Sequence, residues 1–131
     1  MMATVLVVDD EPSVRELIKD TLELEDHEVQ EAVDGPGALE SLRAEDLPDC
    51  VVLDIMMPGM SGLDVLTELR AVPATKTLPV ILLTAMTDDA TTWAGWSAGA
   101  NVFLPKPFDP GALLDWIDRV LEGGGEMEPT L

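Results

Sequence analysis

Polar side chains that can do chemistry stand directly after four short apolar runs of this chain. The runs and the residues that follow them are Val5–Val8 with Asp9 and Asp10, Val51–Leu53 with Asp54, Val80–Leu83 with Thr84, and Val102–Pro105 with Lys106. Carboxylates, a hydroxyl and an ammonium group can together hold a metal ion and a phosphoryl group. The sequence therefore points to metal-assisted phosphate chemistry, if the fold gathers the ends of these runs.

The arrangement of these runs predicts that fold. Each run is rich in branched residues and alternates with a segment of helical spacing, which is typical of parallel strands buried between helices. We predict strands over about residues 4–8, 28–32, 50–53, 79–83 and 101–104, and helices that begin at Pro12, Gly35, Ser61, Asp88 and Pro110. The edge position is expected for 28–32, the most polar strand.

Five βα units with short connections imply right-handed crossovers, and hence a parallel sheet with helices on both faces. A flavodoxin-like order, 2-1-3-4-5, and a Rossmann-like order are the two candidates. The loop after the first strand lacks a glycine fingerprint, which favours the flavodoxin-like order. We predict a doubly wound α/β fold of the (βα)5 type, in which ligands bind beyond the carboxyl ends of the strands.

Helical spacing also predicts which side chains face the core. The expected apolar positions are Val14, Leu17, Ile18 and Leu22 in the first helix, Leu63, Leu66 and Leu69 in the third, and Leu113, Leu114, Ile117, Val120 and Leu121 in the last. Ser61 and Asp64 fit a capping box at the start of the third helix. The only histidine, His27, stands in a polar turn, and we expect it at the surface.

Length and composition bound the class of protein. The 131 residues are 47% hydrophobic and 25% charged, which is typical of one globular domain. We expect the domain to span residues 1–122 and residues 123–131, which begin with three glycines, to form a flexible tail or linker. The single cysteine, Cys50, cannot form an internal disulfide and is expected to be a small buried hydrophobe.

Charge and hydropathy narrow the partners. The net charge of −19 repels nucleic acid and anionic membranes, so we expect no direct nucleic acid binding. No apolar stretch approaches the roughly 20 residues of a membrane span, and the first residues show no signal-peptide pattern. We therefore expect no membrane contact and a cytoplasmic location.

In the order 2-1-3-4-5 the first and third strands are neighbours, about 4.8 Å apart. Asp9, Asp10 and Asp54 would then crowd together, raise each other's pKa and destabilise the fold. Mg²⁺ would relieve this repulsion, because it accepts one or two carboxylates together with phosphate oxygens and water. Capping of the following helix would be the better explanation of Asp9 or Asp10 alone, but it is a poor explanation of the whole set.

The set resembles the response-regulator receiver domain of two-component signalling. The matching motifs, in chain order, are Asp9-Asp10, Asp54 with Met57-Pro58-Gly59, Thr84-Ala85, Gly99-Ala100, and Lys106-Pro107-Phe108. Their order and spacing over about residues 4–122 are highly specific to that family. One modest departure is Asn101, which stands where an acidic residue is common.

The resemblance implies a role for each residue of the crevice. Asp54 would be the phosphoacceptor, a carboxylate nucleophile that attacks a phosphohistidine or a small acyl phosphate. Asp10 would coordinate Mg²⁺ directly and Asp9 through water or more weakly, with Asp54 and the backbone carbonyl of Met56 completing the protein ligands. The protein would be no enzyme in the ordinary sense, but would assist its own phosphorylation and dephosphorylation.

It also implies how the phosphoryl group is held and sensed. Lys106 would pair with one phosphate oxygen and Thr84 would donate its hydroxyl to another, while the Lys106–Pro107 peptide bond would be cis. Movement of Thr84 would leave space for the aromatic ring of Phe103. The surface that changes would consist of the fourth helix, the fifth strand and the last helix.

Partners follow from the same resemblance. A sensor histidine kinase or phosphotransfer protein would supply the phosphoryl group. Trp93 and Trp116 lie on the changing surface and are candidate contacts for a homodimer or an output partner, since tryptophan is enriched at binding hot spots. Met56 and Met86 flank the expected path of the hydrolytic water, and their apolar side chains predict a long phosphorylated lifetime.

Two other classes of protein remain as alternatives. A Mg²⁺-dependent phosphohydrolase of the haloacid dehalogenase type also uses an aspartate nucleophile, but needs a second Asp two residues later, where Met56 stands. A flavodoxin-type FMN carrier shares the expected fold, but needs a phosphate-binding loop rich in Ser, Thr or Gly after the first strand. The acidic loop Asp9–Pro12 would instead repel phosphate in the absence of metal.

Overall fold

The computed structural model describes residues 3–43, 46–85 and 98–123. The elements, in chain order, are β1 (Thr4–Val8), α1 (Pro12–Leu24), β2 (Glu28–Ala32), α2 (Gly35–Ser41), β3 (Cys50–Asp54), α3 (Gly62–Ala71), β4 (Val80–Thr84), β5 (Val102–Pro105) and α5 (Pro110–Gly123). The helix expected to begin at Asp88 lies outside the described residues, except for its last position, Ala98.

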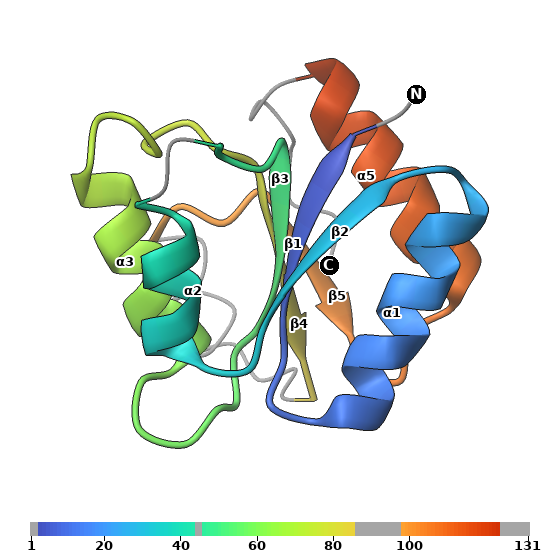
Figure 1. Cartoon of the computed structure of the whole chain (residues 1–131), viewed down its shortest axis with the longest axis horizontal. Helices are drawn as coiled ribbons and strands as arrows, with labels where there is room; N and C mark the ends of the chain where they lie inside the picture. The colour runs from blue at the N-terminus through green and yellow to red at the C-terminus, as the bar shows by residue number, and fades with distance from the viewer. Residues whose placement is uncertain (1–2, 44–45, 86–97, 124–131) are drawn as a thin grey trace.

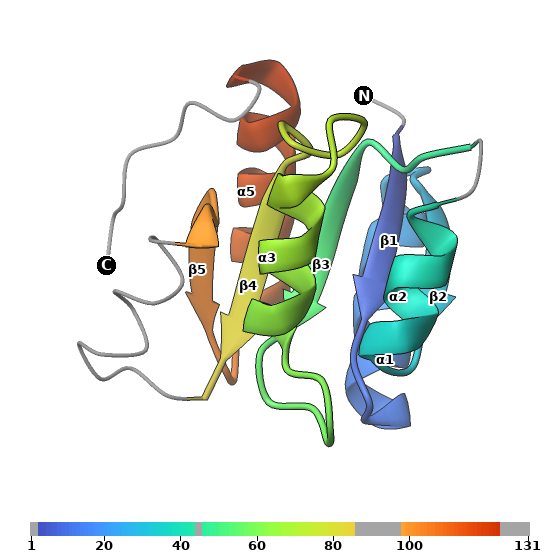
Figure 2. The same cartoon turned by 90° about the vertical axis from the view of Figure 1, so that its left-hand side faces the viewer.

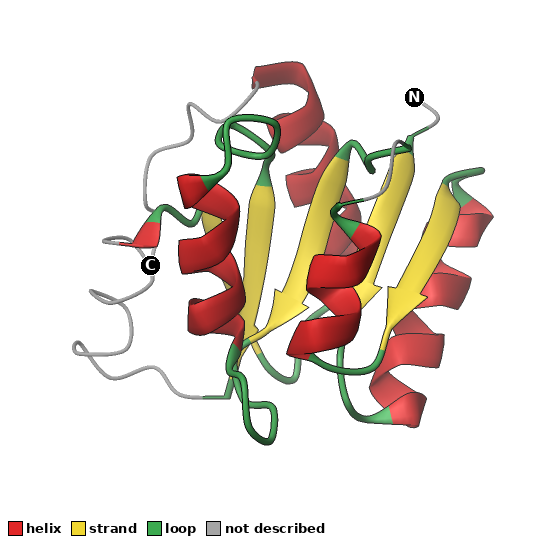
Figure 3. Ribbon diagram, turned by 60° about the vertical axis from the view of Figure 1, so that its left-hand side comes forward, coloured by secondary structure: helices red, strands yellow, loops and turns green. Residues whose placement is uncertain are grey.

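The five strands form one parallel sheet in the order β2-β1-β3-β4-β5. This confirms the predicted flavodoxin-like order and places the polar strand β2 at one edge (Figure 2). All strand arrows point the same way in Figure 3, so the loops that follow them leave at one edge of the sheet. Residue pairs such as Val8 and Leu53 set the register of β1 against β3.

The sheet is covered on both faces, because its side chains alternate between two cores. Helices α2 and α3 lie on one side of the sheet and α1 and α5 on the other (Figure 1). Leu6 and Val8 of β1 pack with the α2 and α3 side, whereas Val5 and Val7 pack with the α1 and α5 side. Because both faces of β1, β3 and β4 are covered, these strands are apolar at nearly every position, in contrast to the polar edge strand β2.

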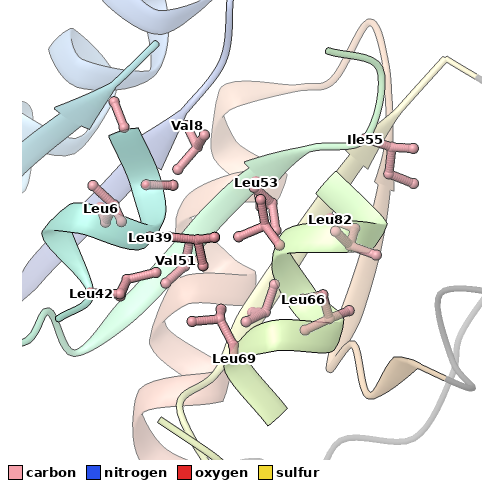
Figure 4. Close-up of a cluster of buried hydrophobic side chains, with 14 of the residues drawn as sticks. Leu6, Val8, Leu39, Leu42, Val51, Leu53, Ile55, Leu66, Leu69 and Leu82 are labelled. Carbon is pink, nitrogen blue, oxygen red and sulfur yellow. The ribbon is translucent and has the colours of Figure 1, made fainter. Parts of the chain in front are cut away.

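The core between the sheet and α2 and α3 is closely packed. Its side chains converge from the sheet and from both helices in Figure 4, including Leu39 of α2, Leu53 of β3 and Leu66 of α3. Leu53 and Leu66 are fully buried. Each such side chain contributes roughly 1.5–3 kcal/mol to the stability of the fold through the burial of apolar surface. This core therefore fixes the position of β3, whose last residue is Asp54.

The loop between β3 and α3 is shaped by two local features. Ser61 caps α3 and forms the expected capping box with Asp64, whose carboxylate accepts a hydrogen bond of 3.0 Å from the Ser61 N–H. Gly62 lies so close to the backbone of Asp54 that a Cβ atom would collide with the Asp54 carbonyl. The start of α3 therefore packs directly against the end of β3 and limits where Asp54 can lie.

Two predictions of side-chain position were wrong. Leu17 is 47% exposed, because the buried stripe of α1 runs through Ile18, Thr21 and Leu22 and leaves Leu17 on its margin. His27 is only 5% exposed. Asp26 adopts a φ of 63°, which turns the chain so that the imidazole Nδ1 accepts a hydrogen bond of 3.1 Å from the Ala3 N–H.

Arg70 joins two loops at the amino-terminal edge of the sheet. Its half-buried guanidinium donates to the carbonyl oxygens of Thr75, Lys76, Leu78 and Gly99, at 2.7–3.2 Å. It also donates to the Asn101 side-chain oxygen, which accepts from the Val80 N–H as well. The α3–β4 loop is thereby tied to the turn that enters β5.

Within the described residues, no helix is both long enough and apolar enough to cross a membrane.

Candidate functional site

Every polar residue singled out at a strand end lies at the carboxyl edge of the sheet. Asp9 and Asp10 directly follow β1, Asp54 and Thr84 are the last residues of β3 and β4, and Lys106 directly follows β5. These strands end at the lower edge of the sheet in Figure 3. Parallel pairing of β1, β3, β4 and β5 is what brings together residues that are up to 97 positions apart.

The three carboxylates form one cluster. Asp9, Asp10 and Asp54 each offer an oxygen, and these oxygens all lie within 4.8 Å of one another. Asp9 is fully buried, Asp54 is 2% exposed, and Asp10 is half-buried. Two buried carboxylates at this separation repel each other strongly, because little water is present to screen their charges.

Lys106 partly neutralises the cluster. Its Nζ lies 3.0 Å from Asp9 Oδ2 and 3.3 Å from Asp54 Oδ1. Burial by itself lowers the pKa of Lys106, but the hydrogen bond to Asp9 and the charges of Asp54 and Asp9 outweigh it, so the pKa is raised. The ammonium group is therefore held charged between the two carboxylates.

The surroundings of Asp54 disfavour its ionised form. Burial, and then the charge of Asp9, raise its pKa from 3.8 to about 6, against the opposing effects of Lys106 and of the Met56 N–H. One lysine does not compensate three acidic groups, so negative charge is left over at this edge. Additional positive charge at the cluster would stabilise the ionised form of Asp54.

The oxygens of Asp9 already have partners within the protein. Oδ1 accepts a hydrogen bond of 2.9 Å from the Glu11 N–H, and Oδ2 accepts the bond from Lys106. Asp10 instead borders an open depression of about 550 Å³ next to the β3–α3 loop. Its other lining residues are Ile55, Met56, Met57, Pro58, Ser61 and Leu63.

This donor set fits a hard divalent cation. The three clustered side chains offer carboxylate oxygens, two of these residues are buried, and one faces open space from which water can complete a coordination sphere. Mg²⁺ prefers such a set of a few carboxylates together with several waters. Asp10 and Asp54 are the best placed direct ligands, because Asp9 is engaged on both oxygens.

Thr84 ends β4, the strand next to β3, and Phe103 lies on the neighbouring strand β5. Thr84 is 3% exposed, and its carbonyl accepts a hydrogen bond of 2.8 Å from the Lys106 N–H. Phe103 is 5% exposed and packs in the core shared with α3. The Lys106–Pro107 peptide bond is cis, the isomer that the resemblance implied.

The remaining residues singled out in the sequence are not all placed. Met86 and Trp93 lie outside the described residues. Trp116 of α5 is half-buried against the core, and the guanidinium of Arg119 lies 5.1 Å from the centre of its ring. The buried thiol of Cys50 has a pKa raised to about 12, mainly by burial and also by Asp49, as expected of an inert cysteine.

Sequence reasoning missed the role of Arg15. Its guanidinium donates a hydrogen bond of 2.8 Å to the Asp9 carbonyl and lies 3.3 Å from a Glu31 carboxylate oxygen. It therefore fixes the backbone of the β1–α1 loop against β2. The only feature of the sequence that could have indicated this role is that Arg15 is the one basic residue in the first half of the acidic helix α1.

The sequence profile of the response regulator receiver domain matches residues 5–118. The chain belongs to this family. The receiver domain is 46% identical over 110 residues to the response regulator PleD of Caulobacter vibrioides, covering 83% of this chain and 24% of PleD. It is 44% identical over 132 residues to the response regulator MprA of Mycolicibacterium vanbaalenii, covering 96% of this chain and 56% of MprA.

Solved structures of receivers match nearly the whole domain. Chemotaxis protein CheY4 of Vibrio cholerae superimposes with a TM-score of 0.85 at 35% identity, covering 92% of this chain and 99% of that one. The receiver domain of a signal transduction histidine kinase from Syntrophus aciditrophicus gives a TM-score of 0.86 at 30% identity, covering 96% and 95%. In contrast, this chain spans only about a quarter of the length of PleD and just over half of the length of MprA.

Proposed function

We propose that Asp54 accepts a phosphoryl group from a phosphohistidine of a sensor histidine kinase or phosphotransfer protein, in a reaction that requires Mg²⁺. The observation that carries this proposal is the cluster of Asp54, Asp9 and Asp10 with Lys106 in a receiver fold. Receiver domains are phosphoacceptor switches, and a buried carboxylate among other carboxylates requires a cation before it can bind an anionic phosphoryl group.

Asp10, Asp54 and the Met56 carbonyl would hold Mg²⁺, with Asp9 contributing through water. When bound, Mg²⁺ supplies positive charge that offsets the charge of the incoming phosphoryl oxygens. The fold holds Asp54 in place through the β3 ladder and the tight approach of Gly62. The Met56 N–H, 3.3 Å from Asp54 Oδ1, orients the carboxylate.

In the reaction, an Asp54 carboxylate oxygen forms a bond to phosphorus as the bond from phosphorus to the donor nitrogen breaks. Lys106 already lies beside that carboxylate and would shift to a phosphoryl oxygen while keeping its hydrogen bond to Asp9. Thr84 would donate its hydroxyl to another phosphoryl oxygen. These groups act mainly by positioning and neutralising charge, which is what phosphoryl transfer requires.

Readout would begin at Thr84. Movement of its hydroxyl toward the phosphoryl group would change the space available to Phe103 on the neighbouring strand, and so the surface of the fourth helix, β5 and α5. A second copy of this chain or an output partner would bind that surface through Trp93 and Trp116. Residues 1–122 would form this cytoplasmic switch, and residues 123–131 its tail or linker.

The haloacid dehalogenase alternative finds no support. Its second aspartate is missing, because Met56 stands two residues after Asp54, and the chain belongs to the receiver family instead. An FMN carrier is also disfavoured, since Asp9 and Asp10 occupy the place of its phosphate loop.

The proposal is tested with a small acyl phosphate, such as acetyl phosphate, and intact mass spectrometry. The wild-type receiver should gain the mass of one phosphoryl group in the presence of Mg²⁺ and none when the metal is chelated. Asp54→Asn should gain none in either condition, and Asp20→Asn, which changes an exposed aspartate of α1, should behave as wild type. Phosphorylation of Asp54→Asn at the wild-type rate would overturn the assignment.

A further inference from the structure

Three methionines follow Asp54 in the β3–α3 loop, and their environments differ sharply. Met56 is 57% exposed, whereas Met57 is 8% exposed and packs in the core. Met60 is half-buried against the same core, and its sulfur lies 2.7 Å from where a Cβ atom on Gly35 would be. Of these three sulfur atoms, that of Met56 is therefore the most accessible to a dissolved oxidant.

Met56 also borders the phosphoacceptor. Its N–H donates to Asp54 Oδ1, and the residue lines the open depression together with Asp10. A change in the polarity of its side chain therefore occurs at the rim of the site that would carry the phosphoryl group. A thioether is a weak hydrogen-bond acceptor, and it gives little help in holding a water molecule there.

We propose that Met56 is an oxidation site for peroxide-class oxidants, and that its sulfoxide shortens the lifetime of the phosphoryl group on Asp54. The sulfur donates an electron pair to one oxygen of hydrogen peroxide, an S–O bond forms as the O–O bond breaks, and the other oxygen leaves as water. The second half of this inference rests on the proposed phosphorylation of Asp54, whereas the first half does not.

Burial protects the sulfur atoms of Cys50 and Met57 from oxidants. Cys50 is fully buried, and its raised pKa keeps the thiol protonated, so it lacks the thiolate that oxidants attack. Met57 has little exposed surface. Oxidation in this part of the chain is thus directed to the residue beside the acceptor and not to the core.

Oxidation replaces a weak acceptor by a strongly polar S=O group. Such an oxygen can hold the water that attacks the aspartyl phosphate. One ordinary hydrogen bond to that water in the transition state corresponds to a hydrolysis rate about two- to tenfold faster. The oxidised receiver should therefore lose its signal sooner, and reduction by the two methionine sulfoxide reductases should restore the longer lifetime.

The first experiment measures the modification itself. The purified receiver is treated with limiting hydrogen peroxide, the reaction is stopped with catalase, and each methionine is followed by peptide mass spectrometry. Met56 should oxidise several times faster than Met57 and Met60. Equal rates at the three positions would overturn the inference without bearing on phosphorylation.

The second experiment measures the consequence. Treated and untreated proteins are phosphorylated with acetyl phosphate and Mg²⁺, desalted, and followed by intact mass as the phosphoryl group is lost. Loss should be two- to tenfold faster after peroxide treatment in wild type and in Met60→Leu, and unchanged by peroxide in Met56→Leu. Each variant is compared with its own untreated sample.

The outcomes separate the two proposals. If untreated wild type takes up no phosphoryl group, the proposed function fails. If it is phosphorylated but peroxide leaves its lifetime unchanged, or if Met56→Leu responds to peroxide as wild type does, only the inference about Met56 fails.

Discussion

Lys106 donates a hydrogen bond of 3.0 Å to Asp9, a residue 97 positions earlier in the chain. The same ammonium group lies 3.3 Å from Asp54. Asp9 thus does two things: it raises the pKa of Asp54 by its charge, and it holds the cation that opposes this effect. Asp9 and Asp54 are both buried beside Lys106, so Asp10 is the carboxylate of the cluster that faces the open side of the site.

Removal of Lys106 should destabilise the fold. Lys106→Met would leave Asp9 and Asp54 buried together without their cation, at a cost of about 2–3 kcal/mol near pH 8. Urea unfolding in metal-free buffer measures the free energy of unfolding. Lys76→Met, at an exposed lysine, should cost less than about 0.5 kcal/mol. Equal stability of the two variants would contradict the importance of this pairing.

The pKa of Asp54 predicts how stability depends on pH. The folded-state pKa is about 6, above the ordinary 3.8, so the folded state binds a proton more tightly than the unfolded state does. Stability therefore falls as the pH rises from about 4 to about 6, and the full penalty, about 3 kcal/mol, remains above that range.

Asp54→Asn should remove this penalty. In metal-free buffer the variant should be about 1–3 kcal/mol more stable than wild type at pH 8, with the difference vanishing toward pH 4. Asp20→Asn controls for the loss of one negative charge from a strongly acidic protein. A difference between Asp54→Asn and wild type that does not vary with pH would argue against a raised pKa at Asp54.

The proposed metal site predicts that Mg²⁺ stabilises the receiver, because the folded cluster would bind the ion and the unfolded chain would not. The melting temperature should rise with Mg²⁺ concentration at pH 8 and respond less below pH 6, where a proton on Asp54 competes with the metal. Asp10→Asn should weaken the response about tenfold or more in metal concentration. Calorimetric titration of the two proteins measures this directly, and an unchanged affinity would remove Asp10 from the ligand set.

A polar side chain in place of Met56 should shorten the phosphorylated lifetime. Gln can hold the attacking water where the thioether cannot, so Met56→Gln should lose its phosphoryl group about two- to tenfold faster than wild type. The decay is followed by intact mass after removal of the acyl phosphate. Met60→Gln is the control, because it adds the same polar group farther along the loop, away from Asp54. Equal rates of phosphoryl loss in the two variants would contradict a role of residue 56 in holding the attacking water.

Arg70 should contribute to stability far from the acidic cluster. The guanidinium of Arg70 is planar and reaches five acceptors in two loops, whereas a lysine carries its three donors on one nitrogen. Arg70→Lys should therefore lower the free energy of unfolding by about 2–3 kcal/mol. Arg43→Lys is a matched control, because Arg43 is exposed and lies 4.0 Å from Glu68. Chemical denaturation of both variants gives the difference, which should be close to zero for Arg43→Lys.

Local patterns in the sequence predicted the sheet and its order well, because each strand and helix carries its own signal. A continuous apolar strand such as Cys50–Asp54 requires helices on both faces of the sheet. The capping box of Ser61 and Asp64, a motif of only four residues, marks the start of α3. The position of Asp9, Asp54 and Thr84 at strand ends then follows from parallel pairing alone.

What only the tertiary structure decided are the contacts between distant segments. No local spacing indicates that Lys106 bonds to Asp9, that Arg15 holds the Asp9 carbonyl, or that His27 is buried beneath Ala3. The sequence determined which groups reach the carboxyl edge of the sheet, since the period of strands and helices is a local property. Packing decided which of those groups are already paired, because burial and hydrogen bonding depend on all the elements that meet there.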